Sequence, residues 1–293
     1  MNTLWNKQQE IDFFVSSLKI ATPEQLFYIA DDGHYYAYWP KNHKGKTETL
    51  QSRNAFIGSY TEKWCKYLFG EIAEEMGGYA VQGVICEEIG LSNKSRADLS
   101  ICKNKNTIQE PENILLIFEV KMSVVWNWEL RMAGSKKELL CLGDYRTHQG
   151  NPGLLRSDTM LKGIGKSINI RVSSDKASSI PIIIIGNTPV TQSYCDKVDH
   201  LKKSGVVQGF WSVNPRPLDN DGENIKNTLH RGFYRFDSFD ELKKETISLL
   251  NEERKFFSSM QSKKSLGRII EIANRENTFE EKAHRFLDLI RNS

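Results

Sequence analysis

The sequence predicts an α/β fold built around a mixed β-sheet. Two short runs, Ile114–Phe118 and Ile180–Ile185, are apolar on both faces, which is typical of strands in the middle of a sheet that is covered on both sides. Segments with helical spacing of apolar residues precede and separate these runs, at 59–76 and 157–171. Strands and helices that alternate in this way predict helices packed on the faces of one sheet.

The first part of the chain has its own pattern. An apolar stripe from Trp5 to Leu18 predicts a helix, and Thr22-Pro23-Glu24-Gln25 predicts a second start with a capping box and Pro at the first helical position. Residues His34–Trp39 alternate as a short strand does, and the polar stretch 40–53 predicts a loop. We therefore expect residues 1–57 to form an N-terminal helical extension.

The core is expected at residues 58–215. Its first helix is predicted to begin at a capping box, Ser59-Tyr60-Thr61-Glu62, and to end at Gly77-Gly78. Residues 122–142 fit a helix or a strand, and residues 143–153 predict a loop. The other elements are expected in the order strand, strand, strand, helix, strand, helix and strand, at residues 79–87, 97–102, 114–121, 157–171, 180–185, 193–203 and 206–213.

The helix at 157–171 is expected to bury a stripe of apolar side chains, which consists of Met160, Leu161, Ile164 and Ile168. After the core, residues 216–293 predict a mostly helical C-terminal extension. Its helices are expected at 239–257, at 266–275 and after a cap formed by Thr278 and Glu281. No convincing boundary divides the chain, so we expect a single domain over residues 1–293.

Composition excludes several classes of protein. The 293 residues include 40 Lys plus Arg against 37 Asp plus Glu, and 39% are apolar, which is the profile of an ordinary globular chain. No apolar run approaches the roughly 20 residues of a bilayer helix, and the start lacks a signal-peptide pattern, so we expect a cytoplasmic protein with no membrane partner. The five cysteines are widely spaced without a CxxC pair, which argues against a zinc ribbon or a disulfide framework.

The net charge of +3 hides two basic segments. Residues 34–66 contain six basic and two acidic side chains, including Lys46 and Glu48, and residues 136–171 contain seven basic and three acidic side chains, including Lys136. Basic clusters are the electrostatic footprint of nucleic-acid binding, although solvated surfaces produce them as often.

Charged residues at the end of an otherwise apolar strand point to chemistry. Glu119 and Lys121 follow the run Ile114–Phe118 and share one face, because residues i and i+2 of a strand point the same way. Asp98 lies at the start of the preceding strand, where it can converge with Glu119. Two carboxylates that converge repel each other unless a cation lies between them, and oxygen ligands without His or Cys favour Mg²⁺ or Mn²⁺.

Asp98 followed by Glu119-Val120-Lys121 resembles the PD-(D/E)XK nuclease superfamily. The resemblance covers about 130 residues in the expected order α-β-β-β-α-β of a restriction-endonuclease-like core. It departs from the family pattern at Ala97, where the family usually has Pro. The resemblance implies that Asp98, Glu119 and the main chain of Val120 bind Mg²⁺, with Mn²⁺ as a substitute, and that Lys121 assists hydrolysis of a DNA phosphodiester.

The same resemblance implies a further glutamate on the first core helix. Glu62 matches that position, and its alternative role is the N3 residue of the capping box with Ser59. Glu71 on the same helix is the reserve candidate. Glu87 and Glu88 end the first core strand and could equally approach the metal, although solvated strand ends are the simpler interpretation.

Candidate DNA contacts lie around the helix at 157–171. Lys162 and Lys166 are one helical turn apart, so we expect them to present two ammonium groups to a phosphate backbone. The preceding loop carries side chains whose donors suit base edges, and an ordinary polar loop is the alternative. These loop candidates are Arg146, His148, Gln149 and Asn151.

The sequence therefore predicts a Mg²⁺-dependent endonuclease of double-stranded DNA that resembles a Type II restriction enzyme, acting as a homodimer. Two alternatives stay open. One is a repair, junction-resolving or modification-dependent nuclease of the same fold, and the other is a non-catalytic DNA-binding protein on a nuclease-like scaffold.

Overall fold

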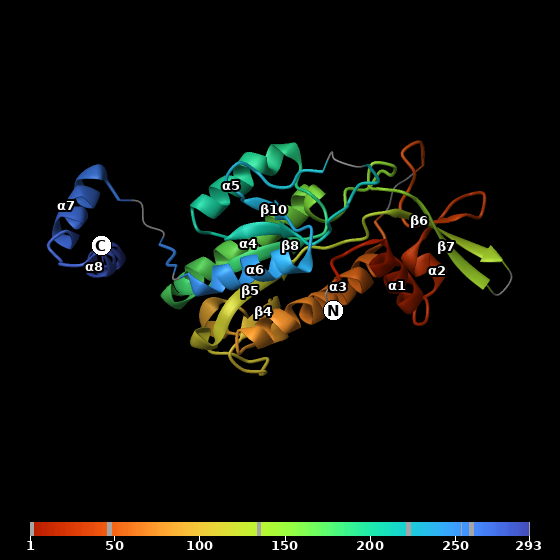
Figure 1. The fold of residues 1–293 in the computed structure, drawn as a ribbon. Coiled ribbons are helices and arrows are strands. Elements are labelled where there is room, and N and C mark those ends of the chain that lie inside the picture. Colours follow the sequence, from red (N-terminus) through yellow and green to blue (C-terminus); the bar gives the residue numbers. More distant parts are fainter. Residues whose placement is uncertain are drawn as a thin grey trace.

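The computed structural model describes residues 3–45, 49–133, 136–220, 224–252, 254–257 and 261–292. These residues form an α/β fold around a mixed six-stranded sheet with helices on its faces (Figure 1). The strand order is β10-β9-β8-β5-β4-β3, in which β3, β4 and β5 are antiparallel neighbours and β5, β8, β9 and β10 run parallel. The strands are β3 (Tyr79–Val84), β4 (Ala97–Cys102), β5 (Ile114–Val120), β8 (Ile182–Gly186), β9 (Gly209–Ser212) and β10 (Phe233–Arg235).

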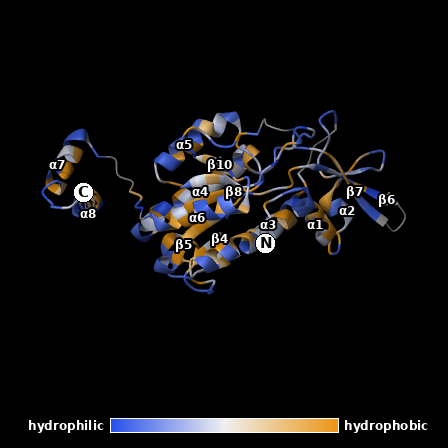
Figure 2. Ribbon diagram, in the orientation of Figure 1, coloured by the Kyte–Doolittle hydropathy of each residue, from blue (hydrophilic) through white to orange (hydrophobic). Residues whose placement is uncertain are grey.

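The two apolar runs are the central strands β5 and β8, as expected, and Figure 2 shows apolar residues along the sheet beneath the helices. On one face lie α3 (Gln51–Glu75) and α6 (Phe239–Asn251), and the ring of Phe118 in β5 lies 4.2 Å from the ring of Phe69 in α3. On the other face lie α4 (Ser157–Ser173) and α5 (Cys195–Lys203). Burial of apolar side chains on both faces explains why these strands show no alternation.

A close approach fixes α4 on the sheet. Gly163 of α4 is buried, and a Cβ atom at this position would lie 3.2 Å from Cδ1 of Ile184 in β8. A side chain at this position would require the Ile184 side chain to shift by a few tenths of an ångström. Of the expected apolar stripe of α4, Met160 is buried and Ile164 packs partly buried against the core, as expected. The expectation is wrong for Leu161 and Ile168, which are exposed, because the helix turns the side with Gly163 and Ser167 to the sheet.

A second, four-stranded antiparallel sheet has the order β1-β2-β6-β7. It consists of β1 (Tyr28–Ile29), β2 (Tyr35–Tyr36), β6 (Asn127–Ala133) and β7 (Lys136–Gly143). The N-terminal part of the chain supplies two of these strands along with α1 (Lys7–Ser17) and α2 (Pro23–Leu26), so it is not purely helical. The sequence fits either a helix or a strand at residues 122–142, and the structure shows the hairpin β6–β7 there.

Helix α3 begins earlier than expected. It starts at Gln51, so the predicted loop at 40–53 ends before Gln51, and the segment Ser59-Tyr60-Thr61-Glu62 lies inside the helix. The capping-box interpretation of this segment is therefore wrong, and the Thr61 hydroxyl instead donates to the Ile57 carbonyl oxygen at 2.9 Å. A capping-box pattern inside a helix has no free N–H groups to bind.

The C-terminal part is mostly helical, with α6, α7 (Lys263–Ala273) and α8 (Phe279–Arg291). The capping box of Thr278 and Glu281 at the start of α8 is confirmed. One strand was missed: β10 pairs with β9 and forms an edge of the central sheet. Within the described residues, none of the helices combines the length and the apolar character that a membrane span requires.

A buried carboxylate on α1 holds the chain where it leaves the central sheet. Glu10 is fully buried and accepts hydrogen bonds from the main-chain N–H groups of Val125 (2.6 Å) and Trp126 (3.2 Å). It also accepts hydrogen bonds from the indole N–H groups of Trp5 (3.2 Å) and Trp128 (2.8 Å). The tryptophans at 126 and 128 therefore belong to the core, and the segment after β5 is tied to α1.

We expect Glu10→Gln to lower the free energy of unfolding by about 3 kcal/mol, because the new amide nitrogen would face N–H donors.

Burial raises the pKa of Glu10 from 4.5 to about 7, although four N–H groups oppose the rise. Because the pKa of Glu10 is higher in the folded protein than in the unfolded chain, protonation of Glu10 favours the folded state. This contribution is complete below the pKa of Glu10 in the unfolded chain and is lost as the pH rises through its pKa in the folded protein. Urea unfolding from about pH 5 to about pH 8 should therefore show wild-type stability falling with pH.

Glu10→Gln should flatten this profile. Asp12→Asn is the matched control, because Asp12 is an exposed carboxylate on the same helix. A wild-type slope retained in Glu10→Gln would contradict the assignment.

Candidate active site

Four charged side chains from three elements meet at one end of β4 and β5. Asp98 is the second residue of β4, Glu119 lies near the end of β5, Lys121 follows β5 directly, and Lys166 comes from α4. Glu119 and Lys121 lie on the face of the sheet that α4 covers, because Phe118 and Val120 point to the face with α3. The antiparallel register of β4 and β5, with Leu99 opposite Phe118, brings Asp98 next to Glu119.

Both ammonium groups bridge both carboxylates. Lys121 Nζ lies 2.6 Å from Glu119 Oε1 and 3.3 Å from Asp98 Oδ2. Lys166 Nζ lies 2.6 Å from Glu119 Oε2 and 3.1 Å from Asp98 Oδ1. The main-chain N–H of Val120 also donates to Asp98 Oδ2, at 2.8 Å. Two negative and two positive charges therefore balance within this cluster.

The cluster is largely withdrawn from water. The side chain of Glu119 is 6% exposed, and those of Asp98, Lys121 and Lys166 are 16 to 18% exposed. Burial and the adjacent Asp98 raise the pKa of Glu119, while the ammonium groups of Lys121 and Lys166 oppose the rise. Burial would lower the pKa of Lys121, but Glu119 and Asp98 more than offset it and raise this pKa. Low water exposure strengthens each of these charge interactions.

The donor set fits a hard divalent cation. Lys121 Nζ contacts Glu119 Oε1, Asp98 Oδ2 and the carbonyl oxygen of Val120 (3.2 Å), so one cation already touches an oxygen of all three expected ligands. Glu119 Oε2 is buried and accepts no hydrogen bond from the described residues, so its contact with Lys166 is an ion pair only. Oxygen-only ligands suit Mg²⁺ or Mn²⁺. In the described part of the chain, no three His, Cys, Asp or Glu side chains form a metal-binding group, so a main-chain oxygen is needed.

Glu62 lies beside the cluster without contacting its ammonium groups directly. It projects from α3, and Gln82 Nε2 of β3 donates to Glu62 Oε2 at 2.9 Å. Burial raises the pKa of Glu62, the hydrogen bond from Gln82 opposes the rise, and Asp98 reinforces it. Glu71 is exposed and lines a different cavity, so of the two helix candidates only Glu62 is near the cluster.

A cavity of about 700 Å³ opens the cluster to solvent. Glu62, Asp98 and Lys166 line it, together with Lys66 from the basic segment at 34–66 and with two basic side chains that were not singled out from the sequence, Lys94 and Arg96. Lys94 and Arg96 precede Asp98 in the turn before β4. Their positive charge close to Asp98 is the one feature of the sequence that could have identified them as site residues. Glu87 belongs to the short 3₁₀ helix Glu87–Ile89, and Glu88 pairs with Lys176, so neither joins the cluster.

The two lysines expected to act as a pair have different surroundings. The side chain of Lys162 is 78% exposed and lies 3.9 Å from Asp158, whereas Lys166 is bound to the two carboxylates. In this structure the Lys166 ammonium faces Asp98 and Glu119, not the solvent beside Lys162, and the expected contact of both lysines with a phosphate backbone stays a prediction. Helical spacing predicted that they share a side of α4, but it did not show that the start of β4 and the end of β5 lie against Lys166.

The loop before α4 also differs from expectation. His148 is buried, its Nε2 lies 3.2 Å from the Val125 carbonyl oxygen, and its ring stacks on Tyr38 with centroids 4.0 Å apart. Burial lowers the pKa of His148 to about 4, so its ring is neutral at pH 7 and serves packing, not base reading. Arg146 pairs with Asp144 and Asn220. Gln149 and Asn151 are exposed.

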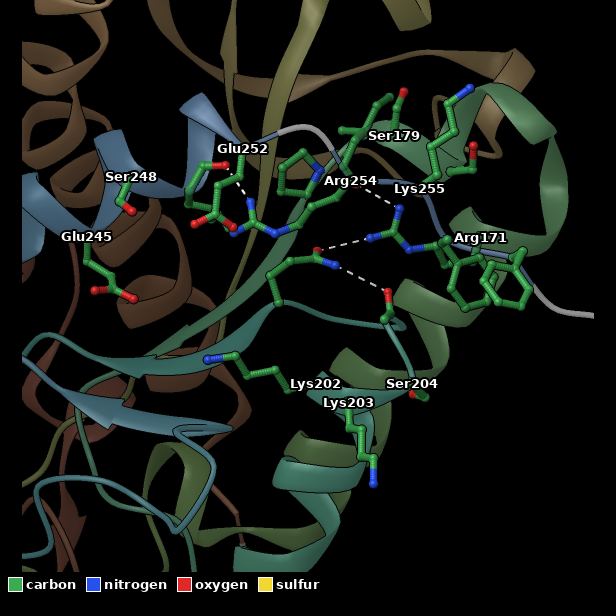
Figure 3. Close-up of a pocket in the computed structure, with 18 of the residues that line it drawn as sticks. Arg171, Ser179, Lys202, Lys203, Ser204, Glu245, Ser248, Glu252, Arg254 and Lys255 are labelled. Carbon is green, nitrogen blue, oxygen red and sulfur yellow. Dashed lines mark hydrogen bonds and ion pairs between the residues drawn. The ribbon is translucent and has the colours of Figure 1, made fainter. Parts of the chain in front are cut away.

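Another cavity, of about 780 Å³, lies at the opposite end of the parallel strands, before β8 and β9 (Figure 3). Arg171 in its wall donates to the carbonyl oxygens of Ile180 (2.7 Å) and Val206 (3.2 Å) and to Gln208 Oε1 (3.0 Å). Burial lowers the pKa of this guanidinium, and its hydrogen bonds tie the end of α4 to the sheet. Arg171, one of the basic residues at 136–171, is thus structural.

Of the other charged residues in the two basic segments, Lys46 and Glu48 lie outside the described residues, as does the side chain of Lys136. No family model matches the chain, and neither the curated proteins nor the solved structures yield a match. The functional conclusion therefore depends on the geometry of Asp98, Glu119, Lys121 and Lys166.

Proposed function

We propose that this protein is a Mg²⁺-dependent endonuclease that hydrolyses phosphodiester bonds of double-stranded DNA, resembling a Type II restriction enzyme. The observation that carries the proposal is the contact of Lys121 Nζ with Asp98, Glu119 and the Val120 carbonyl oxygen. An ammonium group and three oxygen ligands at the ends of two adjacent strands are the parts that metal-assisted phosphodiester hydrolysis requires.

The element order supports the same proposal. From α3 to β8 the elements of the central sheet and its helices follow the order helix, three antiparallel strands, helix and a parallel strand, with the hairpin β6–β7 of the second sheet inserted between β5 and α4. Without this hairpin the order matches the α-β-β-β-α-β order expected of a restriction-endonuclease-like core, with Asp98 and Glu119 on the second and third strands and Lys121 directly after the third.

In this proposal Asp98 and Glu119 hold the cation together with the Val120 carbonyl oxygen. Bound Mg²⁺ would supply a Lewis acid at the scissile phosphate and a water of lowered pKa as the nucleophile. Lys121 positions the nucleophile and offsets negative charge that develops on the phosphate. Glu62 and Gln82 lie across the cavity and orient water on the side of α3.

Lys166 has two states in this proposal. Without the metal its ammonium neutralises both carboxylates. A divalent cation would take over that role and free Lys166 for a phosphate oxygen on the wall of the same cavity. The basic side chains Lys66, Lys94 and Arg96 then continue the contact along the backbone of the substrate.

Digestion of plasmid DNA tests the proposal. The purified protein should convert supercoiled plasmid into discrete fragments with Mg²⁺ or Mn²⁺ and leave it intact with EDTA. Cleavage confined to branched, damaged or methylated DNA would favour a repair or modification-dependent nuclease. DNA binding without cleavage under all these conditions would refute catalysis and favour a binding protein. We also propose a homodimer for cutting both strands, which sedimentation of the protein–DNA complex tests.

A further inference from the structure

A further cavity, of about 630 Å³, lies next to the cluster along α4. Met122 and Ser123, which directly follow Lys121, line it on one side, and Lys162 lines it one helical turn before Lys166. The cavity is thus separated from the carboxylates by Lys121 and one turn of α4.

Four side-chain amides converge on the cavity from two parts of the chain. Gln51 and Asn54 come from the first turn of α3, and Gln149 and Asn151 come from the loop before α4. Gln149 Nε2 donates to the carbonyl oxygens of Lys41 (3.3 Å) and His43 (2.7 Å). The side-chain amides of Gln51, Asn54 and Asn151 make no hydrogen bond within the described residues, so their donors and acceptors are available to a ligand.

Rigid packing holds this wall in place. The Arg53 guanidinium is buried over the ring of Tyr38, 4.5 Å from its centroid, and it donates to the Ala37 carbonyl oxygen. The other partner of the Tyr38 ring is His148, whose Nε2 lies 3.2 Å from the Val125 carbonyl oxygen. These contacts join α3, the segment after β2 and the loop before α4, so they hold the main chain that carries the amides in place.

The charge of the cavity suits DNA as well. Arg156 and Lys162 line it, and Asp158, the one acidic side chain among its described lining residues, pairs with Arg156 at 2.5 Å. The cavity therefore combines basic groups for phosphate with unpaired amides, and amides are the side chains that bind adenine through both its N6 and N7 atoms.

We propose that this cavity binds base edges in the major groove of the substrate, with Asn54 and Asn151 selecting an adenine. The proposal rests on the proposed function, because it identifies the specificity-determining residues for the same DNA. It adds the first turn of α3 to the predicted loop contacts and assigns His148 a positioning role. The base edge lies across the cavity from Lys162, which contacts the adjacent phosphate.

Selection of duplexes from a randomised DNA pool, with Ca²⁺ in place of Mg²⁺ to prevent cleavage, tests this inference independently of catalysis. Sequencing of the bound DNA should give a preferred site that contains adenine at fixed positions. Asn54→Ala and Asn151→Ala should each lower the preference for adenine at one position by about 5- to 100-fold. Asn274→Ala, an exposed amide on the surface after α7, should leave the site unchanged.

Asn54→Asp and Asn151→Asp keep the size of the side chain and remove the amide donor, so they cover the case in which an alanine variant is unfolded. They should shift the preference from adenine to cytosine, since a carboxylate accepts a hydrogen bond from cytosine N4. Selected sequences without adenine, no selected sequence, or identical sites in wild type and all folded variants would overturn the inference. Absence of plasmid cleavage would refute the nuclease alone.

Discussion

Asp98→Asn and Glu119→Gln are each expected to reduce plasmid cleavage by at least about 10³-fold while the protein stays folded. Both changes keep the size of the side chain and remove the negative charge that a divalent cation requires. The amide that Asp98→Asn introduces would retain an oxygen for the main-chain N–H of Val120, which donates to Asp98 Oδ2 at 2.8 Å in the wild type. Cleavage rates with Mg²⁺ and with Mn²⁺ measure the effect.

Both variants should lose affinity for the metal as well as cleavage rate. Calorimetric titration with Mn²⁺ should detect binding to the wild type and much weaker binding to either variant, because each removes one of two carboxylates. Glu71→Gln is the control, since it removes an exposed carboxylate from α3 and leaves the cluster intact. Undiminished cleavage by Asp98→Asn or Glu119→Gln would remove these residues from the active site.

The sequence predicts the central part of this fold well because local and global preferences agree there. The runs that form β5 and β8 are apolar on both faces, and a short run of this kind is stable only as a strand buried between two layers of helices. The hairpin β6–β7 is different. Trp128 and Leu130 alternate with Glu129 and Arg131, yet only pairing with β2 shows that this alternation belongs to a strand.

The convergence of Asp98 with Glu119 follows from strand adjacency, so sequence reasoning reaches it. The role of Lys166 does not follow, because it depends on where α4 crosses the sheet. That crossing is set by the contact of Gly163 with Ile184, between residues 21 positions apart. Likewise, the helical interpretation of Gln51 and Asn54 was missed, since no capping residue marks the start of α3 and its N-cap position is Leu50.

Among variants that keep both carboxylates, Lys166→Met is expected to have the largest effect on stability, metal binding and cleavage. Removal of this ammonium leaves Asp98 and Glu119 facing each other with Lys121 as their one remaining cation among the described residues. The unfolding free energy without metal should fall by about 2 kcal/mol, less than for a fully buried pair because Lys121 remains. Lys162→Met should change it little, since that side chain is 78% exposed.

Divalent metal should reverse this deficit. Lys166 Nζ pairs with Asp98 Oδ1 and Glu119 Oε2, so its ammonium group competes with Mg²⁺ for these two carboxylates in the wild type but not in Lys166→Met. We expect Mg²⁺ to bind the variant about tenfold more tightly and to raise its unfolding free energy more than that of the wild type. Urea unfolding at several Mg²⁺ concentrations measures both effects in one experiment.

Cleavage should respond in the opposite direction. If Lys166 moves from the carboxylates to a phosphate oxygen, Lys166→Met binds metal better and yet cleaves about 10²-fold more slowly, because the transition state has lost a cation. Tighter metal binding with faster cleavage would mean that Lys166 only competes with the metal. Equal stabilisation of wild type and variant by Mg²⁺ would mean that the metal does not bind between Asp98 and Glu119.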